Sequence, residues 1–412
     1  MVNFDKITLD NGLKVIVHQD KSTPIVAMNI IYQVGSRDET PDKTGFAHLF
    51  EHLMFGGSVN IPKYDEPLQN AGGENNAFTN NDFTDYYLTL PKNNIETAFW
   101  LESDRMLSLA FSEKSLEVQR QVVIEEFKQN YLNQPYGDIY LLLKPLAYKQ
   151  HPYRWNTIGK EVSHIENATM QDVKDFYKKF YNPNNAILSI AGDVKPDDIY
   201  KLAEKWFAGI KNGSKINKSY LQEPEQKENR NLTVERHIPQ NAIYMAWHMD
   251  KRNSSGFYAT DLISDVLSNG NSSRLFMQLI KEKQMFTDIN AFVSGDIDKG
   301  LFIISGKLNN GTTVEEAEKA IDEQLKKIST ELVSEQELQK VKNKLEANLV
   351  YSRLSVLNKA MNLGFYEMLE DCSLLEVESE KYKSISREEI RRKAAEIFAP
   401  GKKNKLVYLA KN

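Results

Sequence analysis

The stretch GFAHLFEHLMFGGS, residues 45–58, aligns with GFYATDLISDVLSNG, residues 256–270, at an offset of 211 positions. Three further pairs of similar stretches keep the same order along the chain, and their offsets are 215, 217 and 218. These pairs start at residues 23 and 238, 169 and 386, and 186 and 404. A single match carries no weight, but four matches in register predict a duplicated unit of about 215 residues.

Each half of the duplication has the same pattern of apolar periodicity. The pattern predicts two strands, a helix, a strand, long helices, and then a helix followed by a final strand. This order indicates an α+β fold in which helices pack on a mostly antiparallel sheet. The polar stretch KNGSKINKSYLQEPEQKENRN, residues 211–231, has almost no large apolar residue and is typical of a linker. We therefore expect an amino-terminal domain at 1–211, a linker at 212–230 and a homologous carboxy-terminal domain at 231–412.

The composition is that of a globular protein. The chain has 412 residues, too many for one ordinary core, and it is 41% hydrophobic and 26% charged. The net charge of −5 gives no reason to expect nucleic acid or an anionic membrane as a partner, and no apolar run is long enough for a membrane span. Cys372 is the single cysteine, so an internal disulfide is excluded and a reducing compartment is favoured. We expect a cytoplasmic protein, or a periplasmic one if a signal peptide has been removed.

The first copy of the repeat carries polar residues where its twin is apolar. The alignment sets His48, Glu51 and His52 opposite Ala259, Leu262 and Ile263. In a helix, the two histidines are four residues apart and project from one face, within reach of one metal ion. The pattern HxxEH thus offers two imidazoles as zinc ligands and a glutamate as general base, in the mirror order of HExxH. The alternative is a pair of hydrogen-bonded core histidines beside a surface glutamate.

A third zinc ligand is expected on a different helix. The stretch SEKSLEVQRQVVIEEFKQNYLNQPYG, residues 112–137, is strongly helical and holds two adjacent candidates, Glu125 and Glu126. Its predicted inward arc consists of four apolar residues, Leu116, Val122, Val123 and Phe127. At roughly 100° per residue, Glu126 lies about 70° from the centre of this arc, and Glu125 points nearly opposite. Glu126 is therefore the candidate ligand, although a glutamate in a charged helix is more commonly only solvated.

These motifs are similar to those of the inverzincin peptidases of the pitrilysin and insulysin type. The closest similarity is to the short bacterial members related to the beta subunit of the mitochondrial processing peptidase. The resemblance covers nearly the whole chain and includes TLDNGLKVIV, GSRDETPDKTGFAHLFEHLMFGGS, AGGENNAFTNNDFTDYY, WLESDRM, RQVVIEEF, NQPYG, HPYRWNTIG, YNPNNAILSIAGDV and NSSRLF. Taken together these stretches are highly specific, whereas HxxEH by itself is only suggestive.

The resemblance implies both a fold and a metal centre. The family has two similar α+β domains that face each other across a chamber, which agrees with the internal repeat. One zinc ion per chain is implied, held by His48, His52 and Glu126. Glu51 matches the family's general base. The implied reaction is hydrolysis of a peptide bond by a water molecule that zinc activates and the base deprotonates.

The resemblance also implies a substrate-binding strand within NNAFTNNDFTDYY, residues 75–87. In the family this strand lies at the edge of a sheet, and a substrate peptide adds to it at the positions matched by Asn76, Ala77 and Phe78. Because strand addition recognises the main chain, it suits short or unfolded peptides. The alternation of Tyr86, Leu88 and Leu90 predicts a half-buried strand next to it. A hairpin without a role in binding is the alternative.

Three positions depart from the family pattern. Gln119 stands seven residues before Glu126, where the family often has a glutamate that supports the metal ligands through hydrogen bonds. Active single-chain members carry an arginine and, seven residues later, a tyrosine that contact the substrate carbonyl, but this chain has Lys281 and Asp288 there. Lysine lacks the planar fork of arginine, and an aspartate repels a developing oxyanion instead of donating to it.

We therefore interpret the chain as the metal-bearing member of a heterodimer whose homologous partner supplies the Arg/Tyr clamp. Two alternatives stay open, namely a self-sufficient homo-oligomeric peptidase and a non-catalytic scaffold subunit. The intact metal motif argues against the scaffold. Arg274 in SSRLF is a separate family position, and we interpret His151 in HPYRW as part of an aromatic turn and not as a zinc ligand.

Overall fold

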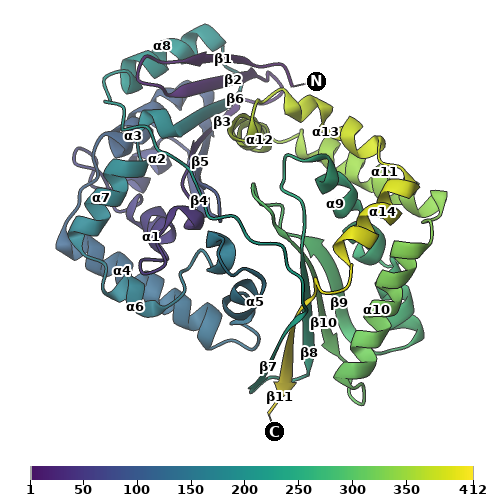
Figure 1. Cartoon of the computed structure of the whole chain (residues 1–412). Coiled ribbons are helices and arrows are strands. Elements are labelled where there is room, and N and C mark those ends of the chain that lie inside the picture. Colours follow the sequence, from purple (N-terminus) through teal and green to yellow (C-terminus); the bar gives the residue numbers. More distant parts are fainter. Residues whose placement is uncertain (1, 412) are drawn as a thin grey trace. The chain divides into compact units, whose positions relative to one another are not determined.

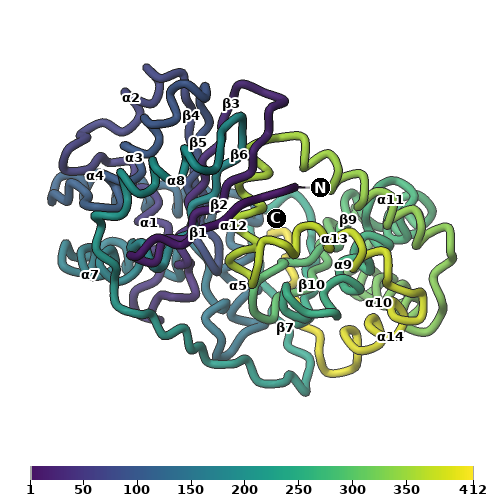
Figure 2. The backbone as a smooth tube through the Cα atoms, turned by 90° about the horizontal axis from the view of Figure 1, so that it is seen from above, coloured from purple at the N-terminus to yellow at the C-terminus, as the bar shows by residue number. Residues whose placement is uncertain are grey.

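Two β-sheets organise the computed structural model, which describes residues 2–411 (Figure 1). The first sheet has six strands in the order β1-β2-β6-β3-β5-β4, so β4 lies at its edge. Neighbouring strands are antiparallel except β2 and β6, which are parallel. The hairpin of β1 and β2 is drawn in purple in Figure 2. The strands are β1 (Asp5–Thr8), β2 (Lys14–Gln19), β3 (Ile25–Tyr32), β4 (Glu74–Thr79), β5 (Thr84–Pro91) and β6 (Ala186–Gly192).

The second sheet repeats this topology without a counterpart of β1. Its five strands have the order β7-β11-β8-β10-β9, which matches β2-β6-β3-β5-β4, and its parallel pair, β7 and β11, occupies the equivalent place. The strands are β7 (Arg230–Arg236), β8 (Ala242–His248), β9 (Phe286–Val293), β10 (Leu301–Leu308) and β11 (Asn404–Ala410). The expectation of two homologous α+β domains with mostly antiparallel sheets is confirmed.

The helix that precedes the last strand of each half starts at an equivalent cap. Helices α7 (Met170–Phe180) and α14 (Arg387–Ile397) follow the N-caps Thr169 and Ser386. Each cap hydroxyl accepts a hydrogen bond from the N–H three residues later, and the carboxylate of that later residue accepts from the cap N–H. A reciprocal cap of this kind stabilises a helix start by about 1 kcal/mol. The two helices are 217 positions apart at both ends, the offset that the sequence repeat predicts.

Contacts divide the chain into two units that do not follow chain order. Unit 1 contains Met1–Lys128, Trp155–Tyr220 and Val350–Val377, and unit 2 contains Gln129–Arg154, Leu221–Leu349 and Glu378–Asn412. As a result, the sheet of each unit packs against one helix whose sequence belongs to the opposite half of the repeat (Figure 1). In unit 1, α12 (Val356–Leu369) packs on β2, β3 and β6, and in unit 2, α5 (Ile139–Ala147) packs on β7, β8 and β11. The predicted boundaries at 211 and 231 concern the sequence repeat and stay a prediction.

Small residues let α12 approach the first sheet closely. Ala360 packs fully buried against Ala27 and Ala191, and its carbonyl oxygen accepts a 2.7 Å hydrogen bond from the Ser189 hydroxyl. A side chain at Gly364 would place its first carbon only 2.9 Å from Ser189 Oγ. A larger residue there would therefore push the helix off the sheet.

Helix α1 (Phe46–Leu53) carries the HxxEH motif. It packs against α4, α7 and the edge strand β4.

No helix within residues 2–411 has the length and apolar character needed to cross a membrane. The helices of unit 1 are α1 (Phe46–Leu53), α2 (Asp65–Asn70), α3 (Ile95–Leu107), α4 (Glu113–Phe127), α6 (Val162–Glu166), α7 and α8 (Pro196–Phe207), with α12. Besides α5 and α14, unit 2 contains α9 (Ser255–Ser268), α10 (Val314–Thr330) and most of α11 (Glu335–Ser352), while α13 (Leu374–Lys383) begins in unit 1 and ends in unit 2.

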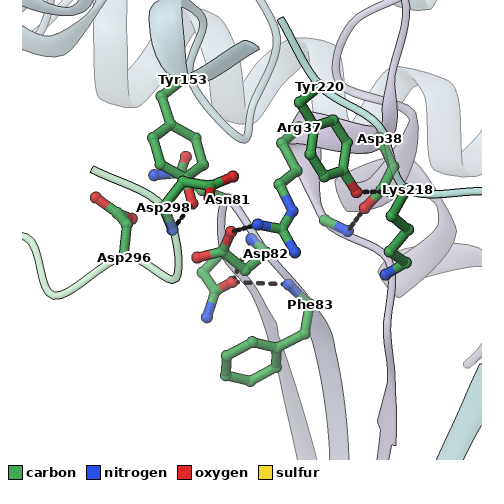
Figure 3. Close-up of polar contacts among 12 residues, drawn as sticks. Arg37, Asp38, Asn81, Asp82, Phe83, Tyr153, Lys218, Tyr220, Asp296 and Asp298 are labelled. Carbon is green, nitrogen blue, oxygen red and sulfur yellow. Dashed lines mark hydrogen bonds and ion pairs between the residues drawn. The ribbon is translucent and has the colours of Figure 1, made fainter. Parts of the chain in front are cut away.

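A buried ion pair fixes the hairpin that joins β4 to β5. Arg37 Nη1 lies 2.8 Å from Asp82 Oδ1, and both side chains are less than a tenth exposed (Figure 3). The guanidinium carbon also lies 4.7 Å from the ring centre of Tyr220, whose hydroxyl donates to Asp38 Oδ1 at 2.6 Å. Tyr220 belongs to the stretch predicted as a linker, so part of that stretch is held on unit 1 beside the hairpin at residues 80–83.

We expect unit 2 to lose stability in mild acid through His248. This histidine ends β8, its Nε2 is buried with no partner among the described residues, and burial lowers its pKa to about 4. Since an unfolded histidine titrates near 6.5, the unfolded state takes up the proton first as the pH falls. Stability is therefore complete above pH 6.5 and declines as the pH falls toward 4, by roughly 2 kcal/mol at pH 5.

Thermal unfolding at pH 7.5 and pH 5 measures this decline. The variant His248→Gln should show a smaller loss of Tm between the two pH values than the wild type. His237→Gln, which changes an exposed histidine of the same unit, is the control and should behave like the wild type. An equal loss of Tm in all three proteins would contradict the prediction.

Candidate metal centre

His48, His52 and Glu126 lie together in unit 1. The two histidines project from α1 and the glutamate from the last turn of α4. The Nε2 atoms of His48 and His52 lie 3.7 Å and 3.5 Å from Glu126 Oε2, and the two rings are nearly perpendicular, with centres 4.9 Å apart. Among residues 2–411 this is the one group of three or more His, Cys, Asp or Glu whose ligand atoms all lie within 4.8 Å of one another.

The environment keeps His48 and Glu126 in the forms that bind a metal. Burial lowers the pKa of His48 to about 4, against the attraction of Glu126, which favours the charged ring. The pKa of Glu126 is lowered, first by its hydrogen bond with His52 and then by the nearby histidine charges, although burial opposes this. Near neutral pH the group therefore combines a neutral His48 imidazole with an ionised carboxylate.

The donor set fits zinc. Two imidazole nitrogens and one carboxylate oxygen form a catalytic zinc set that leaves the fourth position to water or substrate. The side chains of His48, His52 and Glu126 are 14%, 25% and 33% exposed, so an ion held there is within reach of solvent. His48 Nδ1 is buried without a hydrogen-bond partner in the described part of the chain, which leaves Nε2 as the ring atom available to an ion.

Helix α4 separates Glu126 from its neighbour Glu125. As the periodicity predicts, Glu125 points to solvent, where it pairs with Lys128 at 2.9 Å. The predicted inward arc is wrong at Val122, which is 44% exposed, and Ile124 is buried in its place. Val122 is four residues before Glu126 and shares its strip of the helix. The buried face of α4 is therefore turned away from the side of the helix that carries Val122 and Glu126.

Glu51 lies on the same helix as the two histidines and is held by the edge strand. Its Oε2 accepts a 2.7 Å hydrogen bond from the hydroxyl of Thr79, the last residue of β4. Burial raises the pKa of Glu51, and the bond from Thr79 opposes that shift. Thr79 is not among the predicted site residues, because nothing in the sequence marks it beyond its place directly after Asn76, Ala77 and Phe78.

Comparison with known proteins identifies the family. Residues 14–152 match the family described as "Insulinase (Peptidase family M16)", and residues 167–345 match "Peptidase M16 inactive domain". The chain is 30% identical over 362 residues to "Zinc protease PqqE" of Helicobacter pylori. The aligned region covers 84% of this chain and 79% of that protein. The chain belongs to peptidase family M16.

Other relatives confirm the resemblance to the short bacterial members and to the mitochondrial processing peptidase. The crystal structure of "a protease from Helicobacter pylori" superposes with a TM-score of 0.95 at 28% identity, over 99% of this chain and 100% of that one. "Probable mitochondrial-processing peptidase subunit beta" of Schizosaccharomyces pombe is 30% identical over 49% of this chain and 44% of that protein. The HxxEH stretch at residues 48–52 lies within the region that matches the first of the two M16 models.

The bond from Thr79 predicts an effect on the rate of cleavage. In Thr79→Val, assayed alone or with the homologous partner as wild-type cleavage requires, we expect kcat to fall roughly 10–100-fold, because a hydrogen bond to a charged group contributes about 1.5–3 kcal/mol. KM and zinc content should stay unchanged, and Thr79→Ser should retain the rate. Thr89→Val is the control, since Thr89 bonds Glu74 at the other end of β4. Equal kinetics in the two valine variants would contradict this role.

The predicted substrate-binding residues lie on β4, at the edge of the first sheet. Asn76 is exposed, whereas Ala77 and Phe78 are half-buried. The main-chain N–H of Ala77 donates to Asn76 Oδ1 at 2.8 Å, so a peptide that bonds this N–H must displace the Asn76 side chain. The adjoining strand β5 is as expected, with Tyr86 and Leu88 buried on one face. The role of β4 in substrate binding stays a prediction.

The other predicted positions lie in both units. Gln119 is half-buried on α4 in unit 1. In unit 2, Lys281 lies in a π-helical turn with its ammonium 5.7 Å from the ring centre of Phe276. Asp288 is exposed on β9 and accepts a 2.9 Å hydrogen bond from the Asn290 side chain.

His151 belongs to unit 2 and is absent from the metal cluster of unit 1. Its Nε2 lies 3.3 Å from Asp298 Oδ2, and its ring contacts those of Tyr148 and Tyr153. The interpretation of HPYRW as an aromatic turn agrees with these contacts.

Proposed function

We propose that this chain is a zinc-dependent endopeptidase that hydrolyses peptide bonds in short or unfolded peptides. The observation that carries the proposal is the cluster of His48, His52 and Glu126, with Glu51 beside it under a bond from Thr79. A subunit with a purely structural role has no need for two histidines, an ionised carboxylate and a half-buried base at one place.

In the proposed reaction, His48, His52 and Glu126 would hold the zinc ion. When bound there, zinc would polarise the scissile carbonyl and make a water molecule more acidic. Glu51 takes a proton from the attacking water and gives it to the leaving amine. Burial supports this role because it raises the pKa of Glu51 toward the neutral range in which a general base works best. Because the Thr79 hydroxyl bonds Oε2 of Glu51, the other carboxylate oxygen, Oε1, is left to accept the proton of the water molecule.

The substrate class follows from the edge strand. An extended peptide that pairs with β4 at residues 76–78 uses main-chain hydrogen bonds, which any unfolded sequence can supply. Thr79 ends the same strand and bonds the base, so a peptide paired with β4 lies next to Glu51. A folded protein rarely offers an unpaired strand of this kind, which is why we propose short or unfolded chains as substrates.

We infer that full activity needs a second, homologous subunit that supplies an arginine and a tyrosine. Lys281 and Asp288 stand where this pair is expected, and an aspartate beside a developing oxyanion raises the barrier instead of lowering it. One relative carries the word subunit in its name, "Probable mitochondrial-processing peptidase subunit beta", which favours a divided site.

Cleavage of a mixture of unstructured peptides by the purified chain, read by mass spectrometry, tests the proposal. Zinc is measured on the same sample, and Glu51→Gln is the blank. We expect one zinc ion per chain and little cleavage by the chain alone. The double variant Lys281→Arg/Asp288→Tyr should cleave roughly tenfold faster or more, because a single oxyanion donor contributes that much.

Each other outcome has a defined meaning. Strong cleavage by the wild type that is absent from the blank makes the chain self-sufficient and overturns the divided site. A zinc-free chain that cleaves nothing overturns the peptidase proposal and supports the scaffold.

A further inference from the structure

Glu39 is a buried carboxylate that bonds the first turn of the HxxEH helix. It follows a short 3-10 turn, lies outside α1 and is only 8% exposed. Its Oε2 accepts from the main-chain N–H of Gly45 at 2.9 Å, and its Oε1 accepts from that of Ala47 at 2.8 Å. Both oxygens are therefore used on the helix start, one residue before His48.

The residue at the start of α1 cannot cap the first turn with a side chain of its own. Its N-cap is Gly45, which makes no side-chain bond and has a φ of +89°, a conformation that favours glycine. A first side-chain carbon at Gly45 would lie 2.7 Å from the Ile158 carbonyl oxygen and 2.8 Å from Ile165 Cδ1. The serine, threonine or aspartate that usually caps a helix cannot be placed there. The acceptor therefore comes from six residues earlier in the chain.

A loose first turn would move a metal ligand. Helix α1 has only eight residues, and helices this short are marginal unless packing and caps hold them. His48 is the third residue of the helix and His52 the seventh, so fraying at the start displaces one imidazole and leaves the other in place. The equivalent helix α9 has 14 residues and no histidine pair, and its start makes no side-chain cap bond.

We propose that Glu39 is a positioning residue of the metal centre. By accepting from the N–H groups of Gly45 and Ala47, it fixes the first turn of α1 so that His48 Nε2 stands within reach of the ion shared with His52 and Glu126. The inference rests on the proposed zinc binding. It concerns the strength with which zinc is held, and Glu39 touches neither zinc nor substrate.

The zinc affinity of Glu39→Gln, measured by competition with a chromophoric chelator, tests this role. The side-chain NH₂ of glutamine would face one of the two main-chain N–H groups, so that one hydrogen bond is lost while the side chain keeps nearly the same shape. We expect zinc to bind roughly 10–100-fold more weakly, as is usual when a group that orients a ligand is lost. Hydrogen exchange at the Ala47 amide should become faster. Glu39→Asp, one methylene shorter, is a second variant if the first does not fold.

Glu367→Gln is the matched control. Glu367 is a buried carboxylate of the same unit, and its oxygens accept from Lys14 at 2.7 Å and Lys6 at 3.1 Å, on strands that do not carry the metal residues. It should lower Tm without changing zinc affinity. If Glu39→Gln lowers Tm and leaves zinc affinity and Ala47 exchange as in the control, the positioning role is overturned. If the wild type itself binds no zinc, the proposed function fails and the inference falls with it.

Discussion

Replacing Glu51 with glutamine is expected to reduce peptide cleavage by about a thousandfold while zinc stays bound. A general base contributes roughly 10²–10⁴ to the rate, and a carboxamide cannot accept the proton of the attacking water. The side chain keeps its shape, and the amide oxygen is still able to accept the bond from Thr79. Initial rates on a peptide that the wild type, or its reconstituted pair, cleaves would measure the loss.

The control for this variant is Glu125→Gln, which neutralises an exposed glutamate next to the proposed ligand Glu126. It should retain the wild-type rate and zinc content. A Glu51→Gln protein that keeps more than a tenth of the rate would show that another group removes the proton. Loss of zinc from Glu51→Gln would instead show that this carboxylate takes part in holding the metal.

Replacing Glu126 with glutamine is expected to weaken zinc binding by more than about 100-fold. The neutral amide removes the one anionic member of the cluster, whose Oε2 lies 3.5 Å from His52 Nε2. Loss of a group that only orients a metal ligand already lowers metal affinity roughly 10–100-fold. Loss of a ligand itself should lower the affinity by more than that. Chelator competition gives the affinity directly.

Thermal unfolding with and without zinc provides a second measurement. Zinc at 100 times its Kd stabilises the wild type by about 2.7 kcal/mol, so its Tm rises, whereas Glu126→Gln should show almost no rise at the same concentration. Glu125→Gln should respond to zinc as the wild type does. If the two glutamate variants responded alike, Glu126 would not be a ligand.

The sequence by itself predicted the duplication and the elements that repeat. Spacing along the chain carried this information, because a capped helix such as α7 and a strand such as β6 recur in the second half at nearly equal offsets, 217 and 218. Spacing also set His48 and His52 on one face of one helix, and periodicity distinguished Glu126 from Glu125. These are local properties, fixed by 3.6 residues per turn and by residue type.

Only the tertiary structure decided which segments lie against one another. The inward arc of α4 was wrong at Val122 because periodicity tells which residues share a face, whereas the elements that pack on the helix decide which face is buried. The exchange of α5 and α12 between the sheets, and the bonds of Glu39 and Thr79 to the HxxEH helix, join residues from separate elements. No local pattern marks such residues, because their partners are set by how the chain folds back on itself and not by its sequence spacing.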